Sequence, residues 1–172
     1  MKGDYIDSHE SCSIMLPYPE ISIKEKNLSY AKLLKRCYCG LCSELTLVNQ
    51  YNYQQLLMSS YLKEIFQKIA KVEAEHLNIL GELIISLGGD PSYSIPKKNK
   101  ISYWSSKFIK NDTSLKNILI NSINSEIELI KEYRRIASFI EDENIITILN
   151  RIILDEELHI KIFKLIYKNE IQ

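Results

Sequence analysis

Apolar residues recur at intervals of three and four positions along most of the chain, the pattern of helices that bury one face. The pattern begins at Asn27 and predicts four long helices. The first is expected to run unbroken to about Gln55, with Leu34 and Leu41 on its buried side. The second is expected from about Ser60 to Leu87. The other two follow residues 113 and 142.

Polar and glycine-rich segments mark the ends of these helices. Gly88-Gly89 followed by Asp90-Pro91 predicts a firm C-terminal stop for the second helix. Thr113 or Ser114 can cap the third helix. The acidic cluster at 141–143 marks the turn into the fourth helix, since acids suit a helix start.

The lengths of the connections predict the architecture. Short connections make neighbouring helices antiparallel, whereas the segment 88–113 is long enough to cross back along the bundle. The fold class is therefore all-α, a four-helix bundle with one long crossover between its second and third helices. Residues 1–26 contain Pro17 and Pro19 and are expected to form an extended N-terminal arm. Residues 27–172 are expected to form the bundle domain.

The two halves of the bundle repeat one another. Residues 43–51 align with residues 125–133, and residues 69–79 align with residues 152–162. Each half thus contains a Glu on one helix and a Glu-x-x-His motif on the next. Two matching halves predict a bundle with a pseudo-twofold axis.

Helical phase places four glutamates on the apolar faces of the helices: the single Glu of each half and the Glu of each Glu-x-x-His motif. Buried, unpaired carboxylates are costly and repel one another. No cationic side chain is expected on the same faces, so two divalent metal ions are the simplest source of neutralising charge. The alternative is a core of protonated acids and hydrogen-bonded histidines. The candidate metal ligands are Glu44, Glu73, His76, Glu126, Glu156 and His159.

These motifs resemble those of the ferritin-like superfamily, in its rubrerythrin-like and bacterioferritin-like branch. The resemblance covers about residues 27–168 and rests on Glu44, Glu73-Ala74-Glu75-His76, Glu126 and Glu156-Glu157-Leu158-His159. It implies that Glu73 and Glu156 bridge two metals. It also implies that Glu44 with His76 completes one metal position, and that Glu126 with His159 completes the other.

Several departures narrow this resemblance. Rubrerythrins usually carry a C-terminal rubredoxin-type domain with paired Cys-x-x-Cys motifs, and no such domain is expected in this protein. Haem-type bacterioferritins have Met where this chain has Ala74, so no haem is expected. Dimanganese catalases generally lack a bridging Glu on the fourth helix, which counts against that assignment because Glu156 is present.

The expected function is that of a non-haem dimetal oxidoreductase that reduces peroxide or O₂ or oxidises Fe(II). Two Fe ions are expected as cofactors, with Mn as the alternative, because an oxygen-rich ligand set favours these metals. The expected partners are O₂ or H₂O₂, with electrons from Fe(II) or from a separate donor. The other functions considered are an iron-storage cage subunit, a structural assembly protein of the spore-coat kind, and a dimanganese catalase.

Tyrosines and cysteines near the predicted ligands offer further chemistry. Tyr51 and Tyr133 lie two turns beyond Glu44 and Glu126, where they could hydrogen-bond groups around the ligands, pass an electron, or simply pack in the core. Cys37, Cys39 and Cys42 cluster in the first helix. They are read as small buried hydrophobes, with a redox pair as the alternative.

Composition limits the remaining possibilities. The 172 residues include 22 basic and 22 acidic side chains, which argues against nucleic acid as a partner. No apolar run reaches the ~18 residues of a membrane helix, and no apolar leader is present, so a cytoplasmic location is expected, with spore association as an alternative. A homodimer or larger homo-oligomer is also expected. His9 is expected to be a solvated arm residue.

Overall fold

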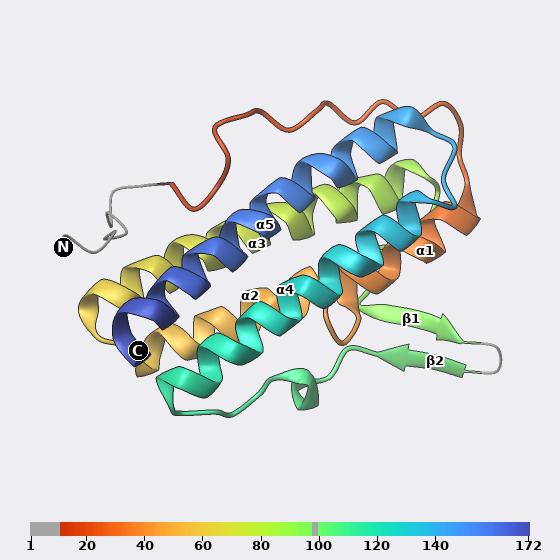
Figure 1. Ribbon diagram of the computed structural model, residues 1–172. Coiled ribbons are helices and arrows are strands. Elements are labelled where there is room, and N and C mark those ends of the chain that lie inside the picture. Colours follow the sequence, from red (N-terminus) through yellow and green to blue (C-terminus); the bar gives the residue numbers. More distant parts are fainter. Residues whose placement is uncertain (1–10, 98–99) are drawn as a thin grey trace.

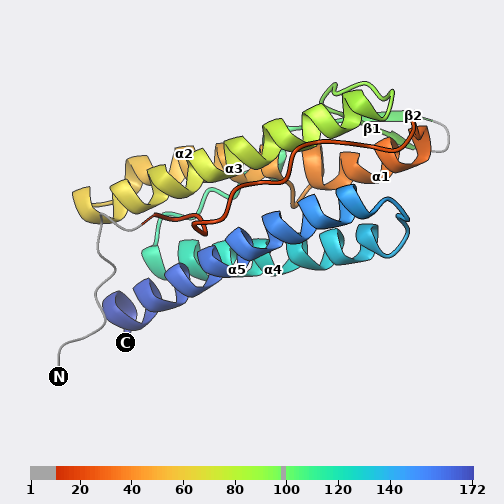
Figure 2. The ribbon, with the colours of Figure 1, turned by 90° about the horizontal axis from the view of Figure 1, so that it is seen from above.

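The computed structural model describes residues 11–97 and 100–172, and His9 lies outside them. The helices are α1 (Leu28–Cys39), α2 (Glu44–Gln54), α3 (Ser60–Ser86), α4 (Leu115–Ala137) and α5 (Glu143–Ile171). Two short 3₁₀ turns, η1 (Gln55–Leu57) and η2 (Ser106–Phe108), lie in the connections. Figures 1 and 2 show a bundle of long, nearly parallel or antiparallel helices, which confirms the predicted fold class.

Two helical hairpins make up the bundle. In the first hairpin, α1 and α2 follow one another and pack on α3; in the second, α4 packs on α5. Contacts between α3 and α5 and between α1 and α4 join the two hairpins. The described residues also show that no helix is long and apolar enough to cross a membrane.

The first bundle helix is broken, which corrects the prediction of one continuous helix. Gly40 ends α1, and Ser43 caps α2 by accepting a hydrogen bond from the Thr46 amide. The hydroxyls of Ser43 and Thr46 both donate to the Gly40 carbonyl at 2.9 Å, so the break leaves this carbonyl satisfied. Leu41 lies in the break and is 62% exposed, contrary to its predicted burial.

The other predicted boundaries are confirmed. At the end of α3, Gly88 has a φ of +82° and its amide donates to Ile85, while the Gly89 amide donates to Ile84. These two bonds are the Schellman arrangement, which favours glycine at the left-handed position. Ser114 caps α4, and Asp142 caps α5.

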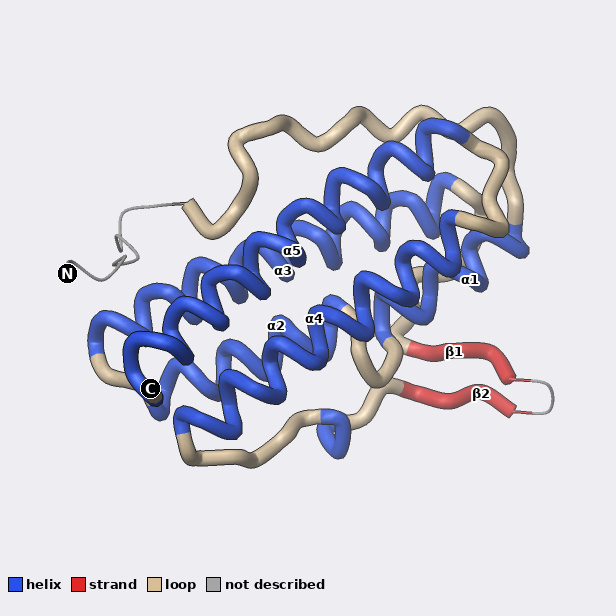
Figure 3. Tube along the Cα trace, viewed as in Figure 1, coloured by secondary structure: helices blue, strands red, loops and turns tan. Residues whose placement is uncertain are grey.

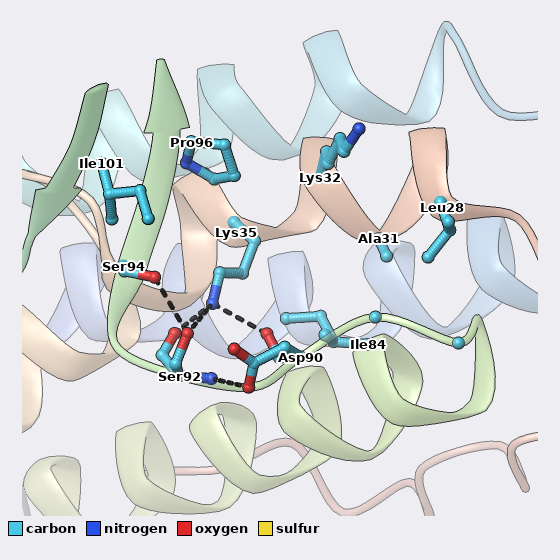
Figure 4. Close-up of a pocket in the computed structure, with 12 residues that line it drawn as sticks. Leu28, Ala31, Lys32, Lys35, Ile84, Asp90, Ser92, Ser94, Pro96 and Ile101 are labelled. Carbon is cyan, nitrogen blue, oxygen red and sulfur yellow. Dashed lines mark hydrogen bonds between the residues drawn. The ribbon is translucent and has the colours of Figure 1, made fainter. Parts of the chain in front are cut away.

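The long crossover contains structure that the sequence did not predict. Strands β1 (Ser94–Lys97) and β2 (Lys100–Tyr103) form an antiparallel hairpin beside α1 (Figure 3). Lys35 of α1 anchors the start of this segment, since its ammonium donates to the Asp90 carbonyl at 2.9 Å and to the Ser92 carbonyl (Figure 4). Lys35 is only 5% exposed, so these bonds replace the water that burial removes.

The N-terminal arm crosses the α3–α5 side of the bundle in an extended path (Figure 2). The amides of Ser22 and Lys24 donate to Asn144 and Asp142 at the start of α5. Nearer the middle of α5, Arg151 donates to the carbonyls of Leu16 and Ile14 at 2.9 and 2.8 Å. The arm is thus fastened along α5 by specific hydrogen bonds.

Substituting Gly40 tests the break between α1 and α2. A Cβ there would lie 2.4 Å from the Arg36 carbonyl oxygen, so Gly40→Ala is expected to lower the free energy of unfolding by about 1–3 kcal/mol. Gly81→Ala is the control, because its Cβ would meet the Tyr38 ring at an ordinary 3.5 Å inside α3. That change is expected to be neutral or stabilising by up to about 1 kcal/mol. Urea unfolding measures both, and equal effects would contradict the steric argument.

Candidate metal centre

The six predicted ligand residues meet at the middle of the bundle, although they come from four helices. Glu44 is the first residue of α2, Glu126 lies within α4, and the two Glu-x-x-His motifs lie in α3 and α5. Every one of the six side chains is fully buried. Their convergence follows from one helical face of each helix turning inward, as the hydrophobic pattern indicates.

The six side chains form two overlapping sets. Ligand atoms of Glu44, Glu73, His76 and Glu156 lie within 4.8 Å of one another, as do those of Glu73, Glu126, Glu156 and His159. Glu73 and Glu156 belong to both sets. The assignment of Glu73 and Glu156 as bridging ligands, with one Glu and one His completing each position, stays a prediction for which this grouping leaves room.

Several of the buried atoms lack hydrogen-bond partners within the described part of the chain. They are Glu44 Oε2, both carboxylate oxygens of Glu73, His76 Nδ1, Glu126 Oε2 and Glu156 Oε1. Buried acceptors without donors are destabilising unless a cation or a proton satisfies them. A group of such atoms that face one another fits two cations, so the residues present suit a dimetal cofactor.

The histidine tautomers strengthen this argument. His159 Nε2 lies 3.0 Å from the Cys12 carbonyl, which can only accept, so this nitrogen carries the hydrogen. His159 Nδ1 then faces Glu73 Oε1 at 3.0 Å and Glu156 Oε2 at 3.1 Å. A lone pair facing carboxylate oxygens is repulsive unless Nδ1 binds a proton or a metal.

His76 is oriented in the same way. Its Nε2 lies 3.2 Å from Asp155 Oδ2, while its Nδ1 lies 2.9 Å from Glu156 Oε1. Both imidazoles thus direct Nδ1 into the cluster and Nε2 outward. This is the arrangement that a metal-binding histidine with a fixed tautomer requires.

The electrostatics of the cluster shift the pKa values of its glutamates in different directions. Burial, together with the charges of Glu156 and Glu73, raises the pKa of Glu44 well above its usual range. Burial and the same two neighbours do so for Glu126. Burial opposes the charged form of Glu73, but the charge of His159 and hydrogen bonds from His159, His76 and Glu44 together outweigh burial and lower the Glu73 pKa.

Both histidines respond to the same charges. Burial favours neutral imidazoles, yet the carboxylates around them outweigh it: Glu156 and Asp155 raise the pKa of His76, and Glu73 and Glu156 raise that of His159. Protons therefore occupy the centre when metals do not.

The two tyrosines singled out in the sequence contact the cluster from across the bundle. The Tyr51 hydroxyl of α2 donates to Glu126 of α4, and the Tyr133 hydroxyl of α4 donates to Glu44 of α2. Burial, followed by the adjacent carboxylate charge, raises the pKa of both phenols, which keeps them protonated donors. These reciprocal bonds obey the pseudo-twofold repeat and leave Oε2 of each Glu facing the cluster.

Four groups around the site were not predicted. Tyr18 and the Cys12 carbonyl come from the arm, and Asp155 and Arg151 come from α5. The cationic one of these groups is Arg151, which is 6% exposed and lies 2.8 Å from Asp155, on the outer side of His76. The spacing of Arg151 and Asp155, four residues apart, could have suggested this pair. No local pattern indicates where the arm lies.

The cysteines lie apart from the proposed ligand sets. Cys37 and Cys39 are buried in α1, whereas Cys42 is partly buried in the break before α2. Burial raises the pKa of the Cys39 thiol to about 11 and that of Cys37 well above its usual range. Protonated, buried thiols are unreactive, which agrees with their interpretation as small core residues.

Comparison with known proteins identifies the family to which this chain belongs. The rubrerythrin family profile matches residues 42–167, which is most of the chain and includes all six candidate ligands. The chain belongs to the rubrerythrin family. Its four-carboxylate, two-histidine cluster makes this rubrerythrin-family chain a dimetal-carboxylate protein, as the resemblance predicted.

Solved structures share the fold of this rubrerythrin-family chain. KatB, a manganese catalase from Anabaena, has 21% identity and a TM-score of 0.82 over 91% of this chain and 78% of its own. Bacterioferritin BfrA of Mycobacterium tuberculosis has 19% identity and a TM-score of 0.70, covering 84% of this chain and 87% of its own.

A ferritin-like, diiron-carboxylate protein of Bacillus anthracis has 23% identity and a TM-score of 0.60, over 79% of this chain and 93% of its own. At these identities the likenesses show the fold alone. A sequence comparison with curated proteins gives no match.

Metal loading is expected to release protons. The raised pKa values of Glu44, Glu126, His76 and His159 favour the protonated form of each group, and metal binding must displace the protons that they hold. Because protons compete with the metal, affinity should rise as pH increases. Calorimetry with Mn²⁺ in buffers of different ionisation enthalpy counts the protons. Release of none would contradict the assigned protonation.

Proposed function

We propose that this protein is a non-haem di-iron oxidoreductase that uses Fe(II) to reduce hydrogen peroxide or O₂. The observation that carries the proposal is the sharing of Glu73 and Glu156 between two ligand sets, each completed by one further Glu and one His. This geometry supports the assignment of Glu73 and Glu156 as bridging ligands.

The donor set supports iron, with manganese as the alternative. Four carboxylates and two imidazoles are ligands that suit iron and manganese, whereas soft thiolate sites select other metals. Four carboxylate charges also balance two divalent cations inside an apolar bundle. Bound as Fe(II), a metal pair supplies the two electrons that convert one H₂O₂, with two protons, into two water molecules.

The protein's own residues control the surroundings of this chemistry. Tyr51 and Tyr133 hold Glu126 and Glu44 through one carboxylate oxygen each, and leave the other oxygen for the centre. All six candidate ligands are fully buried, so the site suits small oxidants and excludes bulky organic substrates. A homo-oligomer and a separate electron donor remain part of the proposal.

An anaerobic reaction tests the activity. The Fe(II)-loaded protein is mixed with one equivalent of H₂O₂ per iron pair. The peroxide should oxidise both irons within a single turnover, as followed by absorption. Glu73→Ala and Glu156→Ala should abolish paired metal binding and this reaction. Glu75→Ala is the matched control, because Glu75 lies two residues from Glu73 on the exposed face of α3 and should leave both unchanged.

Other outcomes would favour the alternative functions. Oxygen evolution from H₂O₂ by the manganese form would indicate a catalase. Accumulation of many irons in a large particle, measured by light scattering, would indicate storage. Metal binding without turnover would favour a structural role, and fewer than one metal per chain after reconstitution would contradict the dimetal centre.

A further inference from the structure

The internal repeat allows the two histidines to be compared directly. His76 and His159 are equivalent in the repeat, but the residues that precede the shared glutamates differ. Asp155 precedes Glu156 in α5, whereas Val72 precedes Glu73 in α3. One half of the bundle therefore offers a carboxylate to the histidine opposite, and the other half offers an aliphatic side chain.

His76 receives the charged partner. Its Nε2 lies 3.2 Å from Asp155 Oδ2 and 3.0 Å from the Tyr18 hydroxyl. Tyr18 donates to the same Asp155 oxygen at 2.6 Å, so its lone pairs remain available to the imidazole N–H. The Ile14 amide donates to the other carboxylate oxygen, Oδ1, at 2.7 Å, and the Arg151 guanidinium lies 2.8 Å from Oδ2. The Ser13 hydroxyl also donates to Oδ1, at 3.3 Å, so these polar groups form one connected network around Asp155.

His159 receives an uncharged partner. Its Nε2 lies 3.0 Å from the carbonyl of Cys12, at the near end of the described arm. The arm thus supplies a hydrogen-bond acceptor for His159 Nε2, which the aliphatic side chain of Val72 cannot provide. The arm therefore contacts Nε2 of both histidines, through a hydroxyl at His76 and a peptide carbonyl at His159.

We propose that these unequal partners make the two metal positions inequivalent, with the His76 position the tighter, and that Tyr18 is a positioning residue for it. An ionised carboxylate accepts a stronger hydrogen bond than a neutral carbonyl. A stronger bond at Nε2 increases electron density at Nδ1, the atom that would bind the metal. The inference rests on the proposed dimetal function and adds an order of loading to it.

A metal titration tests the inference without using activity. The metal-free full-length protein is titrated anaerobically with Co²⁺, a redox-stable substitute for Fe²⁺, and followed by calorimetry and visible absorption. Two resolved binding events per chain are expected. His159→Ala should remove the weaker event, and His76→Ala should remove the tighter one, which assigns each event to its position.

Two further substitutions test whether the hydrogen bonds around Asp155, and not a general change in the fold, set the affinity of the tighter event. Asp155→Asn should weaken the tighter event by about 10–100-fold and leave the weaker event unchanged. Tyr18→Phe should act in the same direction by a smaller factor, because the ring keeps its contacts with His76 and Arg151 and only the hydroxyl is lost. Tyr30→Phe is the matched control, since the Tyr30 hydroxyl accepts from the Glu141 amide at the end of the bundle.

The outcomes distinguish the two levels of the argument. Two events of equal affinity, or an Asp155→Asn variant that weakens only the later event, would overturn the inequality and leave the dimetal centre intact. A Tyr18→Phe variant identical to the Tyr30→Phe control would overturn the positioning role. Failure of the unmodified protein to bind Co²⁺ at all would overturn the proposed function itself.

Discussion

The structure depends on the presence of four carboxylates and two imidazoles inside an apolar helix bundle. Such groups destabilise a core unless opposite charges satisfy them. The orphaned oxygens of Glu73 and the inward Nδ1 of His76 show that the protein side chains alone do not do so. Protons or cations must complete the interior, and the geometry of two overlapping ligand sets suits a pair of cations.

The residues packed around this cluster hold its glutamates in position. The terminal glutamates Glu44 and Glu126 are each held by a tyrosine from the opposite hairpin, which ties the two halves of the bundle together at their most polar point. The break before α2 places Glu44 in the first turn of a capped helix. A carboxylate in that position interacts favourably with the positive end of the helix.

The groups behind the two histidines break the symmetry of the repeat, and they come from both α5 and the arm. The helices repeat every feature of the ligand set, including the reciprocal tyrosines, but not the groups behind the histidines. Asp155 has no acidic counterpart in α3, and the arm contributes Tyr18 on one side and the Cys12 carbonyl on the other. The surroundings of the two histidines therefore differ through one position within the repeat, Asp155 against Val72, and through the arm, a segment without regular secondary structure.

The sequence alone determined the fold class and the six inward side chains, because helical phase and the repeat of Glu and Glu-x-x-His are local properties of the chain. Chain-local signals also located the stop at Gly88 and the cap at Ser114. Only the tertiary structure decided which groups surround the histidines. Tyr18 meets His76 across 58 positions of sequence, and Cys12 meets His159 across 147, contacts that no periodicity encodes. They depend on how the arm packs along α5, through hydrogen bonds between residues more than one hundred positions apart.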